Sequence, residues 1–164
     1  MHIRRSILAL LLFCFALSSP FSVAGNAQGA NPQVEFLTNQ GSFVVELYPD
    51  KAPKTVANFM QYVLSGFYHG TTFHRTVERF MIQGGGLDER LIEKSTFSPI
   101  PNEANNGLKN EPGTLAMARA YDPDSATSQF FINLTDNKFL NFHKPDPRYY
   151  GYAVFGRVIR GIDA

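Results

Sequence analysis

Residues 73–86, FHRTVERFMIQGGG, place an arginine and a glutamine beside an apolar run. Arg75 keeps its charge at any ordinary pH, and its planar guanidinium holds several N–H donors in a fixed fork. Gln83 follows Met81 by two residues, so on a strand both side chains would point to the same face. The stretch has no cysteine, no pair of carboxylates and no metal-ligand spacing. It predicts a site that holds one permanent positive donor in apolar surroundings, without proton transfer or nucleophilic attack.

Other chemistries find little support in the chain. Residues 84–86 are three glycines, but neither the Lys-Ser/Thr of a phosphate-binding loop nor a helical pattern follows them. Ser125 and Ser128 lack the Gly-x-Ser-x-Gly context of a serine nucleophile. The four histidines include no pair at ligand spacing: His2, His69, His74 and His143. We therefore expect neither a metal nor a cofactor.

The elements that must position Arg75 and Gln83 are mostly short strands. Runs rich in β-branched and aromatic residues alternate with turn residues, while residues 84–112 form a long polar stretch typical of loop. The runs are residues 34–38, 42–48, 71–75, 80–83, 113–118, 128–134 and 151–156. Such a pattern predicts a mainly β, antiparallel domain, most simply a closed barrel.

One segment has helical periodicity instead. Pro53 suits a first helical turn, and Gly66 suits the position just past the end. Between them, apolar residues recur at helical spacing: Val56, Phe59, Met60, Val63 and Leu64. We expect this stripe to pack against the core and assign it no chemistry.

The N-terminus has the composition of a secretory signal peptide. Two arginines precede an uncharged apolar run at residues 6–17, and small residues stand at Ser22 and Ala24. We expect cleavage after Ala24, with Ala27 as the alternative site; an uncleaved membrane anchor is the competing interpretation. Residues 25–33 would then be a flexible lead-in to a domain at residues 34–164.

Removal of residues 1–24 changes the chemistry of the exported chain. Cys14, the only cysteine, leaves with the signal, so no disulfide forms. Of 15 Lys and Arg residues 13 remain, against 14 Asp and Glu, which gives a net charge near −1. This balance argues against nucleic-acid binding, and no membrane association is expected after cleavage.

Five motifs in order resemble the cyclophilins, the peptidyl-prolyl cis-trans isomerases that are targets of cyclosporin. They are Phe73-His74-Arg75, Phe80–Gly85, Thr114–Ala118, Ser128–Ile132 and Val154–Gly156. The stretches Asn102–Gly107 and Gly151–Gly156 are most similar to the exported bacterial branch. The resemblance covers residue 34 to the end and implies an eight-stranded antiparallel barrel capped by helices. It also implies a periplasmic location, with secretion as the alternative.

The resemblance also assigns site residues. Arg75 matches the catalytic arginine and Gln83 the glutamine that orients it. Matches to substrate-binding positions are His74, Phe80, Met81, Ala118, Arg119, Ala120, Gln129, Phe131, Phe139, Leu140 and Tyr152. Phe80, Met81, Phe131 and Leu140 would form the proline pocket.

Several positions depart from the family pattern. Phe139 stands where cyclosporin-sensitive relatives carry tryptophan, so we expect weak cyclosporin binding because the indole N–H donor is lost. Arg119 stands where asparagine is common, and Tyr152 where many relatives have histidine. Residues 141–151 form a longer segment than in eukaryotic relatives.

The chain stops at Ala164, where the family's second helix begins. We expect that helix and the closing strand to be missing, which would leave the first strand with a free edge and lower the stability. The main functional hypothesis is a monomeric isomerase that acts on proline-containing polypeptides during folding. The alternative is a non-catalytic chaperone or scaffold that binds proline-containing segments, or an inactive truncated copy.

Overall fold

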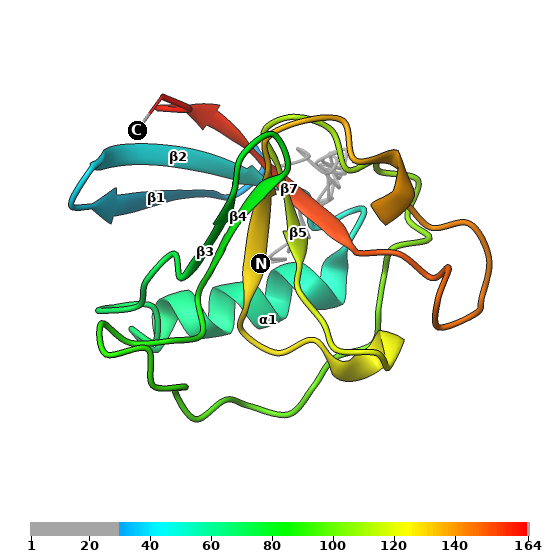
Figure 1. Ribbon diagram of the computed structural model, residues 1–164, viewed down its shortest axis with the longest axis horizontal. Coiled ribbons are helices and arrows are strands. Elements are labelled where there is room, and N and C mark those ends of the chain that lie inside the picture. The colour runs from blue at the N-terminus through cyan, green and yellow to red at the C-terminus, as the bar shows by residue number, and fades with distance from the viewer. Residues whose placement is uncertain (1–29, 164) are drawn as a thin grey trace, which may run out of the picture.

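The computed structural model describes residues 30–163, in which seven antiparallel strands form one curled sheet. Along the sheet the order is β1-β2-β7-β5-β6-β4-β3 (Figure 1). The strands are β1 (Gln33–Thr38), β2 (Gly41–Leu47), β3 (Arg75–Val77), β4 (Met81–Gly84), β5 (Thr114–Met117), β6 (Phe130–Asn133) and β7 (Val154–Arg160). The helices are α1 (Pro53–Leu64) and the 3₁₀ turns η1 (Pro123–Ser125) and η2 (Lys138–Leu140).

The mainly β, antiparallel fold class is confirmed. Residues 30–163 contain seven strands and one α-helix instead of the family's eight strands and two helices, so the curled sheet remains open between β1 and β3. The expected free edge of the first strand is present, because β1 pairs only with β2. The first strand begins at Gln33, one residue earlier than the expected run, and the expected signal peptide lies outside the described residues.

The main core lies between α1 and one face of the sheet. Phe59 is fully buried at its centre and contacts the rings of Phe130 and Phe155 at centroid distances of 5.8 and 5.2 Å. On the opposite face a second cluster contains Met81 and Phe131. Phe130 and Phe131 therefore serve different clusters, as the period of two along a strand requires.

The buried face of α1 is rotated relative to the predicted stripe. Leu64 was expected in the core but is 81% exposed, whereas Tyr62 is fully buried. The Tyr62 hydroxyl accepts a hydrogen bond from the Phe97 N–H at 2.9 Å, and its ring packs on Phe97. A buried tyrosine needs such a partner. Because Phe97 belongs to a loop remote in sequence, helical periodicity alone did not reveal it.

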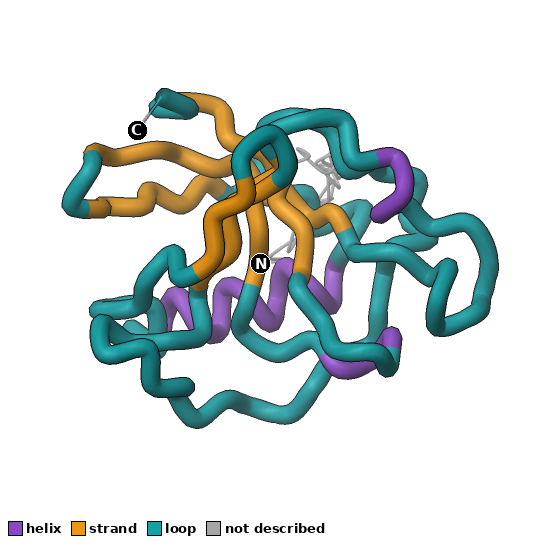
Figure 2. The backbone as a smooth tube through the Cα atoms, viewed as in Figure 1, coloured by secondary structure: helices purple, strands orange, loops and turns teal. Residues whose placement is uncertain are grey.

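Two strands begin three or more residues later than predicted, and the other strand starts differ by one or two residues. Residues 71–74 do not form a strand: Thr71 makes a single bridge to Asp88, and β3 starts only at Arg75. β7 begins at Val154 instead of residue 151, because Gly151 occupies a turn with φ +78°. Figure 2 shows that loops dominate between β4 and β5, as expected for residues 84–112, and between β6 and β7.

Candidate functional site

A row of paired residues crosses five strands and builds the base of the site. Arg75 on β3 is paired with Gln83 on β4, and Gln83 with Phe131 on β6. Phe131 is paired with Ala116 on β5, which in turn faces Val154 on β7. Antiparallel pairing thus brings the predicted arginine and glutamine beside the predicted apolar pocket.

A cavity of about 120 Å³ lies over this row. Such a volume suits a small ring and is well below the roughly 300–1,000 Å³ of sites for drug-sized ligands. All nine residues that line it are among those predicted: Arg75, Phe80, Met81, Gln83, Ala118, Arg119, Phe131, Leu140 and Tyr152. The structure brings these side chains together, and the role of each stays a prediction.

The apolar part of the cavity is rigidly supported. Met81, Phe131 and Leu140 are all buried and belong to the second core cluster. Phe80 packs against this cluster. The ring of Phe139 stacks on the ring of Phe80, with 5.6 Å between the two centroids. Phe139 itself is 69% exposed, so it forms an outer rim and not part of the lining.

Arg75 is held by a short chain of amide contacts. Arg75 Nη1 donates to Gln83 Oε1 at 3.3 Å, and Gln83 Nε2 donates to Gln129 Oε1 at 2.9 Å. Gln129 does not line the cavity, and its side chain orients Gln83. Gly86 makes room for it, because a Cβ at residue 86 would collide with the Gln129 side chain. The glycines at residues 84–86 thus allow neighbouring side chains to pack closely against the backbone.

The remaining two predicted residues lie outside the cavity lining. His74 is half-buried next to Arg75, and its Nδ1 atom has no hydrogen-bond partner among the described residues. Ala120 is exposed, and its carbonyl accepts a hydrogen bond from Arg119 Nη1 at 2.9 Å. Direct substrate contact by either residue remains a prediction.

Comparison with known proteins places this geometry in a family. Residues 33–164 match the family described as cyclophilin type peptidyl-prolyl cis-trans isomerase/CLD. The chain belongs to the cyclophilin family. Peptidyl-prolyl cis-trans isomerase B of Escherichia coli K12 is 55% identical over 130 residues, which cover 79% of each chain. A peptidyl-prolyl cis-trans isomerase of Acinetobacter baylyi is 58% identical over 134 residues, covering 82% of this chain and 70% of the relative.

The solved structures agree with this family assignment. A cyclophilin-type peptidyl-prolyl cis-trans isomerase of Cryptosporidium parvum, crystallised in the presence of the dipeptide Ala-Pro, superposes with a TM-score of 0.66. The two sequences are 30% identical, and the match covers 80% of this chain and 81% of the other. The fold inferred from the five motifs is thus the fold of the family.

A buried asparagine cluster supports the cyclophilin site, and sequence reasoning missed it. Asn137 Nδ2 donates to the Phe80 carbonyl at 2.9 Å and to Asn133 Oδ1 at 2.7 Å. Asn110 Nδ2 donates to the Leu140 carbonyl at 3.1 Å, and Asn133 Nδ2 donates to Asn110 Oδ1 at 3.1 Å. The cluster therefore fixes the backbone of two cavity residues. The sequence signal for this cluster was Asn133, a polar residue that directly follows the apolar residues of β6.

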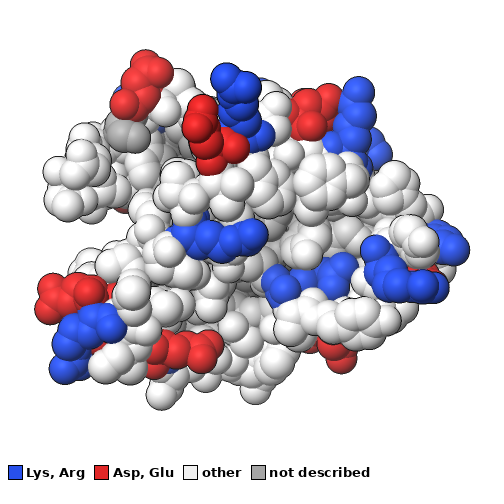
Figure 3. Space-filling view, viewed as in Figure 1, with Lys and Arg blue, Asp and Glu red and all other residues white. Residues whose placement is uncertain are grey.

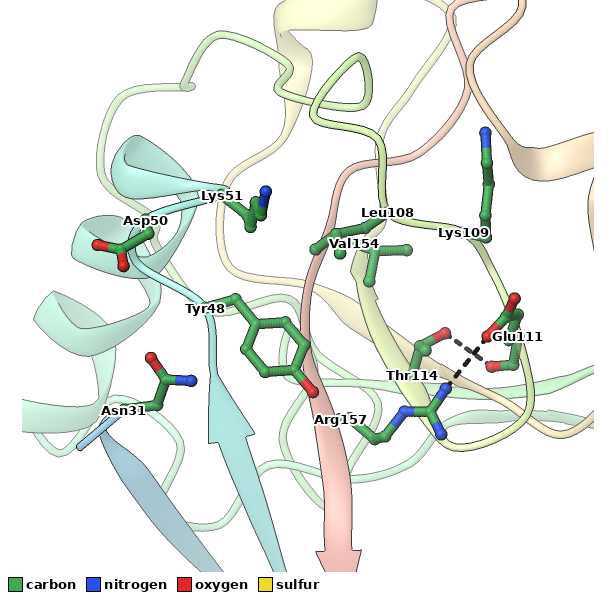
Figure 4. Close-up of a pocket in the computed structure, with 10 residues that line it drawn as sticks. All are labelled: Asn31, Tyr48, Asp50, Lys51, Leu108, Lys109, Glu111, Thr114, Val154 and Arg157. Carbon is green, nitrogen blue, oxygen red and sulfur yellow. Dashed lines mark hydrogen bonds and ion pairs between the residues drawn. The ribbon is translucent and has the colours of Figure 1, made fainter. Parts of the chain in front are cut away.

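A larger cavity, of about 390 Å³, lies elsewhere and contains none of the predicted catalytic residues (Figure 4). Arg157 Nη2 pairs there with Glu111 Oε2 at 3.3 Å, and the Tyr48 ring reaches toward them. Burial, aided by the charge of Glu46, raises the pKa of the Tyr48 hydroxyl. The charged pair in this cavity is already matched, and we assign the cavity no reaction.

Residues 30–163 have neither a cluster of metal ligands nor a membrane-spanning helix. No three or more His, Cys, Asp or Glu side chains in this part of the chain converge as ligands for a metal ion. None of its helices is both long and apolar enough to cross a bilayer. Figure 3 shows Lys and Arg side chains across the middle of one face, and both Lys or Arg and Asp or Glu side chains at its margins.

Proposed function

We propose that this chain catalyses the cis–trans isomerisation of peptide bonds that precede proline. The observation that carries the proposal is the position of Arg75, held by Gln83 at the mouth of a small cavity with an apolar wall. A proline ring in the cavity would bring its own nitrogen toward the guanidinium. Membership of the cyclophilin family supports the same activity.

The reaction requires rotation about a partial double bond, with a barrier of about 18–20 kcal/mol for amides. At the twisted midpoint, resonance is lost and the prolyl nitrogen regains its lone pair. A fixed donor directed at that nitrogen stabilises the twisted state more than either planar isomer, which lowers the barrier. No covalent bond is broken, so the site needs neither nucleophile nor general base.

Each part of the cavity has a role in this scheme. Met81, Phe131 and Leu140 exclude water around the ring, and the lower dielectric strengthens the contact with Arg75. Gln83 uses its carbonyl to orient the guanidinium, and Gln129 holds the amide of Gln83. Arginine suits the task better than lysine because its charge is permanent and its donors are planar.

Replacement of Arg75 tests the proposal. Arg75→Ala should lower kcat/KM by about 10²–10³, as expected for loss of a donor to developing charge. Arg75→Lys should recover only part of the rate. Arg90→Ala is the matched control, because Arg90 pairs with Asp88 and does not line the cavity.

The rate is measured by NMR exchange on an Xaa-Pro peptide and by proline-limited refolding. A wild-type protein that leaves both rates unchanged would reject catalysis and favour a non-catalytic chaperone or scaffold. Equal activity of Arg75→Ala and wild type would instead reject the role of Arg75.

We further propose that the substrates are exported polypeptides encountered in the periplasm, and that the protein works as a monomer with weak affinity for cyclosporin. The signal-like residues 1–24 support the location, and Phe139 in place of tryptophan supports the weak affinity. Cell fractionation with mass analysis of the processed N-terminus tests the location. A mature protein that retains residues 1–24 in the cytosol would contradict it.

A further inference from the structure

Arg119 joins two loop segments beside the cavity through hydrogen bonds to their backbone carbonyls. It follows β5, and its guanidinium reaches across to residues 147–151. The Nη1 atom donates to the carbonyls of Ala120 and Tyr121 at 2.9 and 3.0 Å. The Nε atom donates to the Gly151 carbonyl and Nη2 to the Pro147 carbonyl, at 3.0 and 3.1 Å.

The same guanidinium lies over the ring of Tyr152, with its Cζ atom 4.8 Å from the ring centroid. The other contact of this ring is with Phe131, edge to face at 5.6 Å, in the buried cluster of the cavity. Tyr152 is thus placed between Arg119 and a wall of the proline pocket. The position of its ring depends on both neighbours.

The geometry requires arginine and not merely a positive charge. Four carbonyls in different directions match the planar fork of a guanidinium, whereas an ammonium group is a compact point donor. Among the described residues, the hydrogen-bond partners of the Arg119 side chain are all backbone carbonyls of the surrounding loops. The side chain therefore acts by fixing loop backbone.

Residues 147–151 have further attachments. Gly151 accepts a second hydrogen bond, from Asn102 Nδ2 at 3.1 Å, and the Tyr149 carbonyl accepts one from the His143 N–H within the same loop at 3.0 Å. The Pro147 carbonyl accepts its hydrogen bond from Arg119. Loss of the guanidinium would therefore free the Pro147 end of the segment and loosen the outer side of the Tyr152 ring.

We propose that Arg119 is a positioning residue that closes the 147–151 segment and Tyr152 against the proline pocket, and so sets substrate affinity. The inference rests on the proposed isomerase function. The pocket wall contacts the proline ring equally in the planar and twisted states. A less ordered wall therefore weakens the binding of both states by the same amount. Arg75 and Gln83 remain in place, and the chemical step is unaffected.

The kinetic test uses Arg119→Ala, Arg119→Gln and Arg119→Lys, with Arg90→Ala as control. Each Arg119 variant should raise KM by about tenfold and leave kcat near the wild-type value, the pattern of lost uniform binding. Arg119→Lys should not restore KM. Full recovery by lysine would show that charge alone matters and would overturn the proposal, as would a fall in kcat at unchanged KM.

Hydrogen exchange tests the same proposal without reference to activity. In the Arg119 variants, amides of residues 148–152 should exchange faster, while those of β5 and β6 keep wild-type protection. Unchanged exchange at residues 148–152 would overturn the proposal. Loss of protection throughout the chain in the Ala, Gln and Lys variants would also overturn it, because Arg119 would then support the whole fold.

The two readouts separate this proposal from the proposed function. Absence of isomerase activity in the wild type would reject the function, whereas the exchange pattern still decides whether Arg119 closes the segment. A normal response to Arg75→Ala together with unchanged KM in the Arg119 variants would reject only the closing role.

Discussion

At the residue scale, Phe139 on the rim of the pocket is separate from the Arg75–Gln83 pair. Phe139 stacks on Phe80 and extends from η2 into solvent, with 69% of its surface exposed. The Arg75–Gln83 contact lies on β3 and β4 and does not depend on it. Inhibitor affinity and isomerisation can therefore change separately.

Phe139→Trp should strengthen cyclosporin binding. The indole ring retains the stack on Phe80 and adds an N–H donor at the exposed rim. A new hydrogen bond contributes about 1 kcal/mol, and the larger ring buries further area. We expect at least about a tenfold lower Kd, since 1.4 kcal/mol is one decade. Isothermal titration of both proteins checks this; nanomolar binding by the wild type would refute the expectation.

At the element scale, hydrogen bonds from buried asparagines join β6 and η2 to the residue before β4. Asn133 closes the end of β6, and Asn137 immediately precedes η2. Both are essentially fully buried, and Asn137 links the Asn133 side chain with the Phe80 backbone. Buried amides without partners are costly, so the cluster holds its shape as a unit.

Asn137→Ala should lower the free energy of unfolding by about 1–3 kcal/mol, because it leaves the buried Asn133 Oδ1 atom without a donor. Phe80 would lose one anchor, so KM should rise as well. Chemical denaturation measures the first effect and initial-rate kinetics the second. Asn105→Ala, at an exposed position, is the control. Equal stability of the two variants would show that the cluster contributes little.

At the scale of the whole molecule, the curled sheet of residues 30–163 ends with β1 on one side and β3 on the other. A hollow of about 710 Å³ lies beside the β1–β2 hairpin and is lined in part by Phe36, Phe43, Phe73 and Phe130. Leu37 on β1 is 81% exposed beside it. An exposed apolar edge strand is a template for pairing with another chain. This arrangement favours self-association at high protein concentration.

Leu37→Lys should suppress that association, because a lysine on an edge strand opposes strand pairing. The concentration at which light scattering detects oligomers should rise by about tenfold, a change of roughly 1.4 kcal/mol in association free energy. Leu91→Lys makes the same change in charge at an exposed leucine outside the strands. Equal effects of both substitutions would show that net charge, not the edge, controls association.

The sequence by itself determined the fold class and part of the arrangement of the site. It placed Met81 and Gln83 on one strand face, because the period of two along a strand is a local property. The spacing of five motifs then identified the family. These features depend on residues close together in the chain.

Only the tertiary structure decided which side chains meet across loops. Tyr62 is buried in the core and the predicted Leu64 is not, because the tyrosine hydroxyl accepts a hydrogen bond from the Phe97 N–H. The tertiary structure also joined Asn110 to Asn133 and directed Arg119 to carbonyls some 30 residues away, as in its bond to Gly151. Such contacts have no period along the chain, because they are set by how distant segments pack in space.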